Sequence, residues 1–260
     1  MVTNTIETLS ESKAVNMADE WFQIATAEHF WMQWRHAVVL RAVRMASVAP
    51  QRALEIGCGS GVARMMLERD LGVPVDGCDL NRAALEMAEP GRGRLLSYDI
   101  MDLESSMLQR YDALFMLDVL EHIPADAAFL AAALKHLRPG GIIVVNVPAS
   151  MMFFSQYDRV AGHLRRYARR KLARLFRKSA MEPEGLEYWG LSMVPVLLAR
   201  KVYMRMIPPA DIVRAGFVPP NQAVQSVFGA LRSVETALPF AMPFGSSLLA
   251  LGRRSGAPDA

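Results

Sequence analysis

The chain has 260 residues, of which 52% are hydrophobic, so its length and composition fit one large domain or a domain with a cap. Residues 1–13 are polar, and no stretch of about 20 residues lacks a charged side chain, so the sequence predicts neither a signal peptide nor a transmembrane helix. We therefore expect a cytoplasmic protein. Cys58 and Cys78 lack C-x-x-C spacing, and we expect them to be buried free thiols, with no bound metal.

The net charge of +3 is concentrated in one segment. Residues 162–178 hold eight Arg or Lys side chains and no acid, so the rest of the chain is net negative. Such a segment raises the possibility of a nucleic-acid enzyme. Eight charges on one helix are more typical of a solvated face, and no separate RNA-binding module is visible. We therefore do not expect a nucleic-acid partner.

The elements expected along the chain alternate between helix and strand. Residues 1–15 have no clear pattern, and aromatic residues at helical spacing then predict a leader helix over 17–46. Strands are predicted at 53–56, 74–79, 94–98, 111–117, 142–147, 185–190 and 247–252. Helices are predicted at 61–69, 81–88, 125–137 and 168–178, followed by one that Asn221 caps. The alternation predicts an α/β fold with a doubly wound, mainly parallel sheet of seven strands.

This pattern divides the chain into four parts. We expect an N-terminal helical leader at 1–46, an α/β core at 47–190, a helical cap at 191–245 inserted before the last strand, and that strand with the tail at 246–260. Residues 189–207 are apolar but carry three basic side chains. They fit a cap over the active site, a peripheral membrane contact or a homodimer contact. Pro195 and Pro208 interrupt a long interfacial helix, which favours the cap.

Residues 53–61, A-L-E-I-G-C-G-S-G, predict a strand, a tight glycine turn and a helix. The third glycine, Gly61, comes one residue earlier than in the G-x-G-x-x-G pattern of dinucleotide folds. Glu55 beside the turn repels a phosphate but suits an ammonium or sulfonium group. S-adenosylmethionine carries both cations and no phosphate. The alternative is a glycine-rich turn that binds no ligand.

Two acids end the next two strands. Asp79 comes 22 residues after Gly57, where a carboxylate can accept both hydroxyls of a ribose. That spacing also fits NAD, so Asp79 alone does not identify the ligand. Asp99 comes 20 residues later and suits the exocyclic amine of adenine, with Ile100 against the ring. Its alternative role is to cap a turn.

Five segments, in this order, resemble the motifs of the class I S-adenosylmethionine-dependent methyltransferases. They are E-I-G-C-G-S-G, C-D-L-N at 78–81, S-Y-D-I at 97–100, L-F-M-L-D-V-L-E-H-I-P at 114–124 and L-R-P-G-G-I-I-V-V at 137–145. The resemblance covers about residues 29–190 and the last strand. It implies a Rossmann-like methyltransferase fold, S-adenosylmethionine as cofactor and S-adenosylhomocysteine as product. The predicted cofactor-binding residues are Arg35, Glu55, Gly57, Cys58, Gly59, Gly61, Asp79, Leu80, Asp99, Ile100, Leu117 and Asp118.

The leader contains the segment H-F-W-x-x-W-R, residues 29–35, which looks like the leader helix of a bacterial small-molecule branch of this family. On that resemblance, Arg35 grips the cofactor carboxylate with its planar fork. Aromatic residues, Trp31 among them, then form a wall for the sulfonium and the substrate. The alternative is that the aromatic residues are core and the arginine is solvated.

Two histidines are the candidate catalytic bases. His122 follows the fourth predicted strand, where the transferred methyl group is expected, and His163 lies in Y-D-R-V-A-G-H-L-R-R-Y, residues 157–167. We expect Tyr157, Arg166 and Tyr167 to face the substrate from a lid. The alternatives are that His122 only shapes the pocket and that the second segment is a basic start to a helix.

The sequence thus predicts methyl transfer to a small acidic or hydrophobic acceptor, by in-line displacement. No D/N-P-P-Y/F motif follows the fourth strand, where L-D-V-L stands instead, and this favours an oxygen or carbon acceptor over a ring nitrogen. Three alternatives stay open: a cyclase or lyase that consumes S-adenosylmethionine, an RNA methyltransferase, and a binding module without catalysis.

Overall fold

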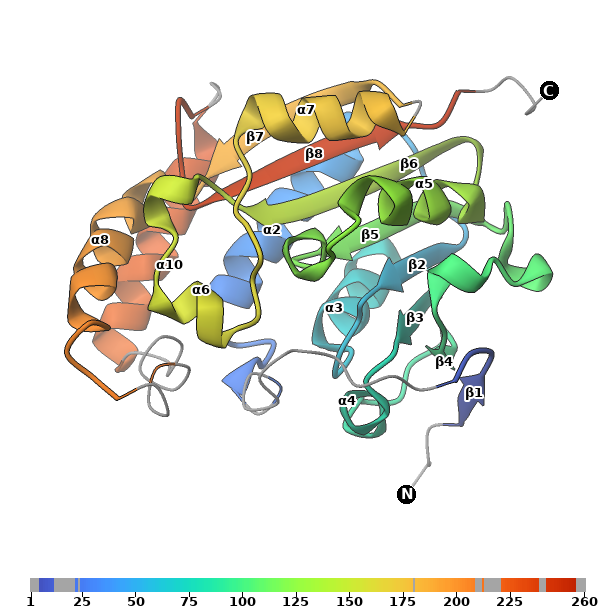
Figure 1. The fold of residues 1–260 in the computed structure, drawn as a ribbon, viewed down its shortest axis with the longest axis horizontal. Helices are drawn as coiled ribbons and strands as arrows, with labels where there is room; N and C mark the ends of the chain where they lie inside the picture. Colours follow the sequence, from blue (N-terminus) through green and yellow to red (C-terminus); the bar gives the residue numbers. More distant parts are fainter. Residues whose placement is uncertain are drawn as a thin grey trace.

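The structure is a computed structural model that describes residues 5–11, 22, 24–179, 181–208, 212, 221–238 and 242–255. A central sheet carries helices on both faces (Figure 1). Its strands are β1 (Ile6–Thr8), β2 (Ala53–Ile56), β3 (Val75–Asp79), β4 (Leu95–Ser97), β5 (Tyr111–Leu117), β6 (Leu137–Pro148), β7 (Pro183–Trp189) and β8 (Ser247–Arg253). The helices are α2 (Phe30–Met45), α3 (Val62–Leu71), α4 (Arg82–Glu86), α5 (Asp126–His136), α6 (Gln156–Val160), α7 (Arg169–Lys178), α8 (Val194–Tyr203) and α10 (Gln222–Ala237).

The sheet has the order β1-β4-β3-β2-β5-β6-β8-β7. Strands β1 to β6 are parallel to one another, and β8 runs antiparallel to both of its neighbours, β6 and β7. The chain proceeds outward from β2 in one direction and then returns to build β5 and β6 on the other side. The carboxyl ends of β2 and β5 therefore flank the point where the strand order reverses, which is where open α/β sheets bind ligands.

Alternate side chains of β5 enter two separate cores. Leu114 and Met116 pack in a cluster with residues of α5 and α7, whereas Ala113, Phe115 and Leu117 pack in another with residues of α2 and α3. This alternation follows from the two-residue repeat of a strand. A strand that is covered on both faces is apolar where it is covered, which is why the A-L-F-M-L part of β5 and the I-I-V-V part of β6 are continuous apolar runs.

The α/β class and the mainly parallel sheet are confirmed, but the sheet has eight strands rather than the seven expected. The additional strand is β1, which pairs Ile6 with Leu95 and Thr8 with Ser97 at the edge of the sheet. Part of the segment expected to be loosely ordered is therefore a strand. Three residues are too few to produce a recognisable alternation, and only the unpaired edge of β4 makes this strand favourable.

The leader helix was expected over 17–46, and the structure corrects its beginning. Helix α2 begins at Phe30, and residues 25–28 before it are not helical, although Phe22 and Ile24 are; residues 17–21 and 23 lie outside the described residues. His29 caps the helix: its Nδ1 accepts a hydrogen bond from the backbone N–H of Trp31 at 3.2 Å. This bond satisfies a donor that the first turn leaves without a partner. Histidine is not a common cap residue, so the sequence did not signal this boundary.

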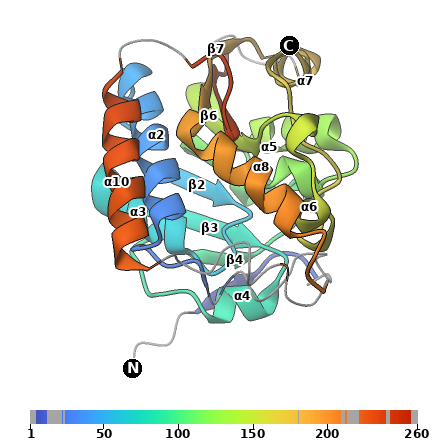
Figure 2. The same ribbon diagram turned by 90° about the vertical axis from the view of Figure 1, so that its left-hand side faces the viewer.

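Among the described residues between β7 and β8, where the cap was expected, lie helices α8 and α10. Figure 2 shows α10 alongside α2, and the rings of Phe30 and Phe228 stack at 4.7 Å between them. Asn221 caps α10 as expected, accepting from the backbone N–H of Val224 at 3.1 Å. The carboxylate of Glu235 accepts hydrogen bonds from the residues that follow β7, including the Leu191 N–H at 3.1 Å. Within the described part of the chain, no helix is both long and apolar enough to cross a bilayer.

Candidate active site

A cavity of about 650 Å³ lies at the carboxyl ends of the parallel strands. The beginning of α2 and helices α8 and α10 form its other walls. Sixteen of the predicted site residues line it: Trp31, Arg35, Glu55, Gly57, Cys58, Gly59, Asp79, Leu80, Asp99, Ile100, Leu117, Asp118, His122, Tyr157, His163 and Arg166. Residues that are far apart in the sequence therefore meet at one edge of the sheet. Gly61 and Tyr167 are not among the lining residues of the described chain.

The glycine turn after β2 brings bare backbone to the cavity. Gly57 has φ of +72°, and a Cβ there would lie 2.6 Å from Cγ2 of Val119, so both its conformation and its surroundings require glycine. Gly61 is the N-cap of α3 and lies behind the turn, which gives it a structural role. The thiols of Cys58 and Cys78 are free and buried, as expected.

Asp79 ties the glycine turn to the end of β3. Its Oδ2 accepts from the N–H of Gly59 and its Oδ1 from the N–H of Asn81, both at 2.8 Å. Burial raises the pKa of Asp79, and these backbone hydrogen bonds oppose the increase. The carboxylate lines the cavity and has lone pairs left for hydroxyl donors.

Glu55 is a buried acid with an unpaired oxygen. Its side chain is 2% exposed, and Oε2 has no hydrogen-bond partner among the described residues. Burial raises its pKa to about 8, although Arg35 and Arg64 favour the charged form. An orphaned carboxylate oxygen at the wall of a cavity is costly unless a cation or donor meets it. The site therefore fits a ligand with an ammonium group, as the sequence predicted for S-adenosylmethionine.

Arg35 is held in a chain of polar contacts behind the cavity. Its Nη1 donates to Oδ2 of Asp118 at 2.6 Å, and Oδ1 of Asp118 accepts from Asn146 at 2.7 Å. Asn146 in turn accepts from the indole N–H of Trp189 at 2.8 Å. Arg35 thus donates to Asp118, and its Nη2 also donates to Sδ of Met32 at 3.2 Å, so only its remaining N–H groups are left for a cofactor carboxylate. The sequence analysis overlooked Asn146, although a polar residue within the apolar run of β6 is a signal for such a role.

Asp99 lies at the end of β4 and also lines the cavity. Its Oδ1 accepts from the N–H of Met101 at 3.0 Å, so it caps the short 3₁₀ helix Ile100–Asp102. The backbone N–H of Asp99 donates a hydrogen bond to the hydroxyl of Ser10 at 2.9 Å. The capping role and the predicted contact with adenine are therefore compatible.

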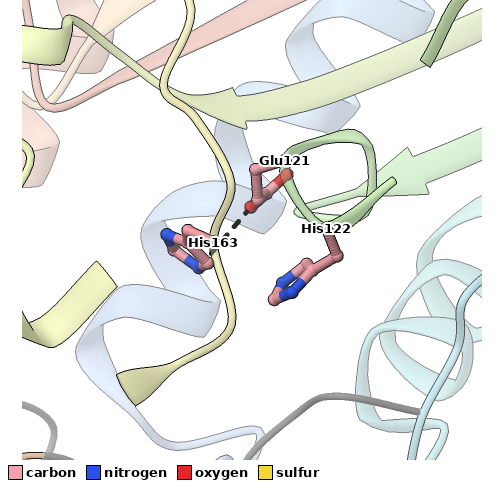
Figure 3. A group of neighbouring side chains, drawn as sticks. All are labelled: Glu121, His122 and His163. Atoms are coloured by element: carbon pink, nitrogen blue, oxygen red, sulfur yellow. Dashed lines mark ion pairs between the residues drawn. The ribbon is translucent and has the colours of Figure 1, made fainter. Parts of the chain in front are cut away.

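Three ionisable side chains meet at the other end of the cavity (Figure 3). Glu121 and His122 belong to the 3₁₀ helix η3 (Leu120–His122) after β5, and His163 follows α6. The two imidazole rings are perpendicular with centroids 4.9 Å apart, and Nε2 of His163 lies 4.0 Å from Oε1 of Glu121. Burial, and after it the neighbouring His163, lowers the pKa of His122 to about 4. Burial, followed by the charge of Asp118, raises the pKa of Glu121 well above its usual range.

A buried carboxylate fixes the orientation of His163. Oδ1 of Asp158 lies 2.9 Å from Nδ1 of His163 and accepts from Nε of Arg166 at 2.7 Å, while Oδ2 accepts from the Ser155 N–H at 2.7 Å. Burial opposes the charge of Asp158, but its bonds to His163 and Arg166 dominate and hold its pKa well below the usual range. Because Asp158 is an acceptor, the proton of neutral His163 lies on Nδ1, and Nε2 is left for chemistry.

Tyr167 does not face the cavity. Its side chain is fully buried, and its hydroxyl donates to the Leu120 carbonyl at 3.1 Å and to Asp126 at 2.9 Å. Its position is that of a packing residue under η3. Besides Asn146, two site residues were not predicted from the sequence: Glu121 and Asp158, which stand next to predicted residues in E-H and Y-D-R. The directions in which these two side chains point could not be derived from residue spacing, because they depend on how two separate loops pack.

Residues 22–184, more than half of the chain, match the sequence family described as a methyltransferase domain. The chain belongs to this methyltransferase family. A ubiquinone biosynthesis O-methyltransferase from Nitrosococcus oceani is 35% identical to it over 120 residues, which are 44% of this chain and 47% of that relative. A second, from Burkholderia vietnamiensis, is 33% identical over 120 residues. The chain therefore matches about half the length of these curated relatives.

Solved structures share the fold of this methyltransferase domain. A S-adenosylmethionine-dependent methyltransferase from Archaeoglobus fulgidus has a TM-score of 0.53 at 17% identity, covering 85% of this chain and 94% of that one. A phosphoethanolamine N-methyltransferase from Haemonchus contortus, in complex with S-adenosyl-L-methionine, has a TM-score of 0.51 at 15% identity, covering 79% and 49%. At these identities the likeness concerns the fold. Family membership, together with the acids at the strand ends, identifies S-adenosylmethionine as the cofactor.

Cofactor affinity is expected to increase with pH. Burial raises the pKa of Glu55 to about 8, so below that pH most of the free protein carries a proton on the carboxylate that we expect to meet the ammonium group. Between about pH 6 and about pH 8 we expect roughly tenfold tighter binding of S-adenosylhomocysteine per pH unit, with release of a proton on binding. Calorimetry in buffers of different ionisation enthalpy measures both quantities.

The matched variants are Glu55→Gln, which removes the titrating group, and Glu86→Gln, which changes an exposed acid on α4 outside the cavity. Glu55→Gln should bind weakly at every pH and release no proton, and Glu86→Gln should behave like the unmodified protein. A flat pH profile in the unmodified protein would show that Glu55 does not meet the ammonium group.

Proposed function

We propose that this protein transfers a methyl group from S-adenosylmethionine to a hydroxyl oxygen of a small, largely apolar acceptor. The observation that carries the proposal is that one cavity joins the acids at the strand ends to the group of Glu121, His122 and His163. The first set suits the cofactor, and the second suits an acceptor that must lose a proton. A sulfonium is already an activated methyl donor, so the protein has to position the acceptor and exclude water.

The acceptor end of the cavity is mostly apolar. Its lining includes Met193, Val196 and Leu197 around the start of α8, and Val224 and Phe228 on α10. One cation also lies there, because the guanidinium of Arg200 stacks on the ring of Tyr157 at 4.5 Å. An acceptor with an apolar body and a weakly acidic group matches this lining.

His163 is the better placed of the two predicted bases. Asp158 holds the proton of its ring on Nδ1, which leaves Nε2 as an acceptor. The pKa of His122 is about 4, so at neutral pH it is a poor proton acceptor. The 120-residue match to ubiquinone biosynthesis O-methyltransferases supports oxygen as the acceptor atom. Because that match covers about half of each relative, it supports the reaction class more strongly than a particular substrate.

The test is to incubate the protein with methyl-labelled S-adenosylmethionine and a panel of hydroxylated aromatic compounds, with and without apolar side chains. We expect a labelled methyl ether and an equimolar amount of S-adenosylhomocysteine, with faster turnover of the apolar members. One panel member with a ring carboxylate is compared with its methyl ester, and the difference in turnover shows the effect of the acidic group. Methylthioadenosine as the product would show a cyclase or lyase instead, and label in RNA with a steep salt dependence would show an RNA enzyme.

A further inference from the structure

We propose that Glu121, His122 and His163 bind a divalent transition-metal ion, with zinc as the best match, at the acceptor end of the cavity. One ligand atom from each residue lies within 4.8 Å of the other two (Figure 3). Zinc bonds of about 2.1 Å place tetrahedral ligand atoms roughly 3.4 Å apart, so the three groups need to approach by roughly 1 Å. Small side-chain rotations achieve this, because the ligands come from two short segments that already face each other.

Three polar atoms of this group are buried and lack a partner among the described residues. Glu121 is 0% exposed, and neither of its carboxylate oxygens has a hydrogen-bond partner among the described residues. The same is true of Nδ1 of His122. Buried acids are normally paired, hydrogen-bonded or bound to a metal. His163, at 4.0 Å from Glu121, is too distant to satisfy this carboxylate by itself. A cation between the three side chains would satisfy all these atoms.

The surroundings of His163 are those of a metal ligand. Histidines that bind metals usually donate their second ring N–H to a carboxylate or carbonyl, which fixes the tautomer and the ring. Nδ1 of His163 bonds to Asp158, which is fully buried and held in turn by Arg166 and Ser155. This support directs Nε2 toward Glu121.

The ligand types indicate which ion fits. Two imidazoles and one carboxylate suit zinc, iron, manganese or cobalt better than magnesium or calcium, which prefer oxygen ligands. Three protein ligands also leave a position open, as in catalytic zinc sites. The role in catalysis rests on the proposed function, with the ion in place of His163 as the group that activates the acceptor: a hydroxyl bound to the ion loses its proton to water more readily. Its oxygen then forms the bond to the methyl carbon while the carbon–sulfur bond breaks, which leaves neutral S-adenosylhomocysteine.

The test is metal binding by the full chain after a chelator has removed bound ions. We expect about one Zn²⁺ per chain in equilibrium dialysis, and a Co²⁺ absorption spectrum typical of nitrogen and oxygen ligands. Glu121→Gln and His163→Gln should each weaken Zn²⁺ binding by roughly 100-fold or more. His36→Gln is the matched control, because His36 pairs with Asp70 at 2.6 Å and does not line the cavity. Its Zn²⁺ affinity should not change.

Binding of S-adenosylhomocysteine by each variant shows that it is folded, and we expect its affinity to change less than about threefold. The proposal fails if the stripped protein binds no ion, or if Glu121→Gln and His163→Gln bind Zn²⁺ as tightly as the unmodified chain. If the ion binds but no hydroxyl compound is methylated, the metal site stands and the proposed function fails. Full methyl transfer by metal-free protein would support the function and overturn the role of the ion.

Discussion

Asp79→Ala is expected to weaken S-adenosylhomocysteine binding by roughly 100- to 1,000-fold. The carboxylate orients the glycine turn through the N–H groups of Gly59 and Asn81, both at 2.8 Å, and we expect it to accept both ribose hydroxyls. Hydrogen bonds to a charged group contribute about 1.5–3 kcal/mol each, and two of them account for the lower end of this range. Loss of the turn geometry adds to the effect, because the cofactor lies against that backbone.

Calorimetry with S-adenosylhomocysteine measures this effect. Asp79→Asn is an informative second variant: it keeps one acceptor oxygen but directs an amide N–H at a backbone donor, so we expect a loss of at least about tenfold. Asp102→Ala is the control, since Asp102 is an exposed acid one turn beyond Asp99. If Asp79→Ala binds within about fivefold of the unmodified protein, the ribose must be held by other groups.

Asp158→Ala is expected to destabilise the protein by about 3–5 kcal/mol. The variant leaves the guanidinium of Arg166, which is 4% exposed, as a buried charge without its carboxylate. It also removes the acceptor for Ser155 and His163. The destabilisation should appear in denaturant unfolding as a lower midpoint with an unchanged slope.

A double-mutant cycle tests this explanation. Arg166→Met removes the charge but keeps most of the volume, so Asp158→Ala combined with Arg166→Met should be less destabilised than the sum of the single variants by at least about 1.5 kcal/mol. Glu182→Ala, which breaks the exposed pair of Arg177 and Glu182, is the control and should change stability by less than about 0.5 kcal/mol. Additive effects in the cycle would mean that Asp158 and Arg166 do not stabilise each other.

Much of the cofactor half of the site could be predicted from local patterns. Glu55, Gly57 and Asp79 each stand at the end of a short apolar run, and parallel strands place such ends at one edge of a sheet. The spacing of the glycines and the acid at the end of β2 also indicated a cationic ligand without phosphate. Nothing more than strand order is needed to bring these residues together, which is why they line the cavity.

The acceptor half could be predicted only in part. His122 and His163 were identified as reactive residues, but Glu121 and Asp158 beside them were not, and Tyr167 was placed at the substrate although its hydroxyl bonds to Leu120 and Asp126. In a loop or a 3₁₀ turn, neighbouring side chains point in different directions. Which of them faces the cavity depends on the packing of the loop and not on its sequence spacing.

The sequence by itself determined the α/β class, the positions of the main strands along the chain and the set of acids and glycines that suit S-adenosylmethionine, because these depend on local periodicity and on residues at strand ends. Tertiary structure alone decided three features: the pairing of β1 with β4, the contact of Arg35 with Asp118, and the meeting of Glu121 with His163. Each joins segments that are distant in the sequence. Their geometry arises only when separate elements pack against one another and exclude water from the polar groups between them.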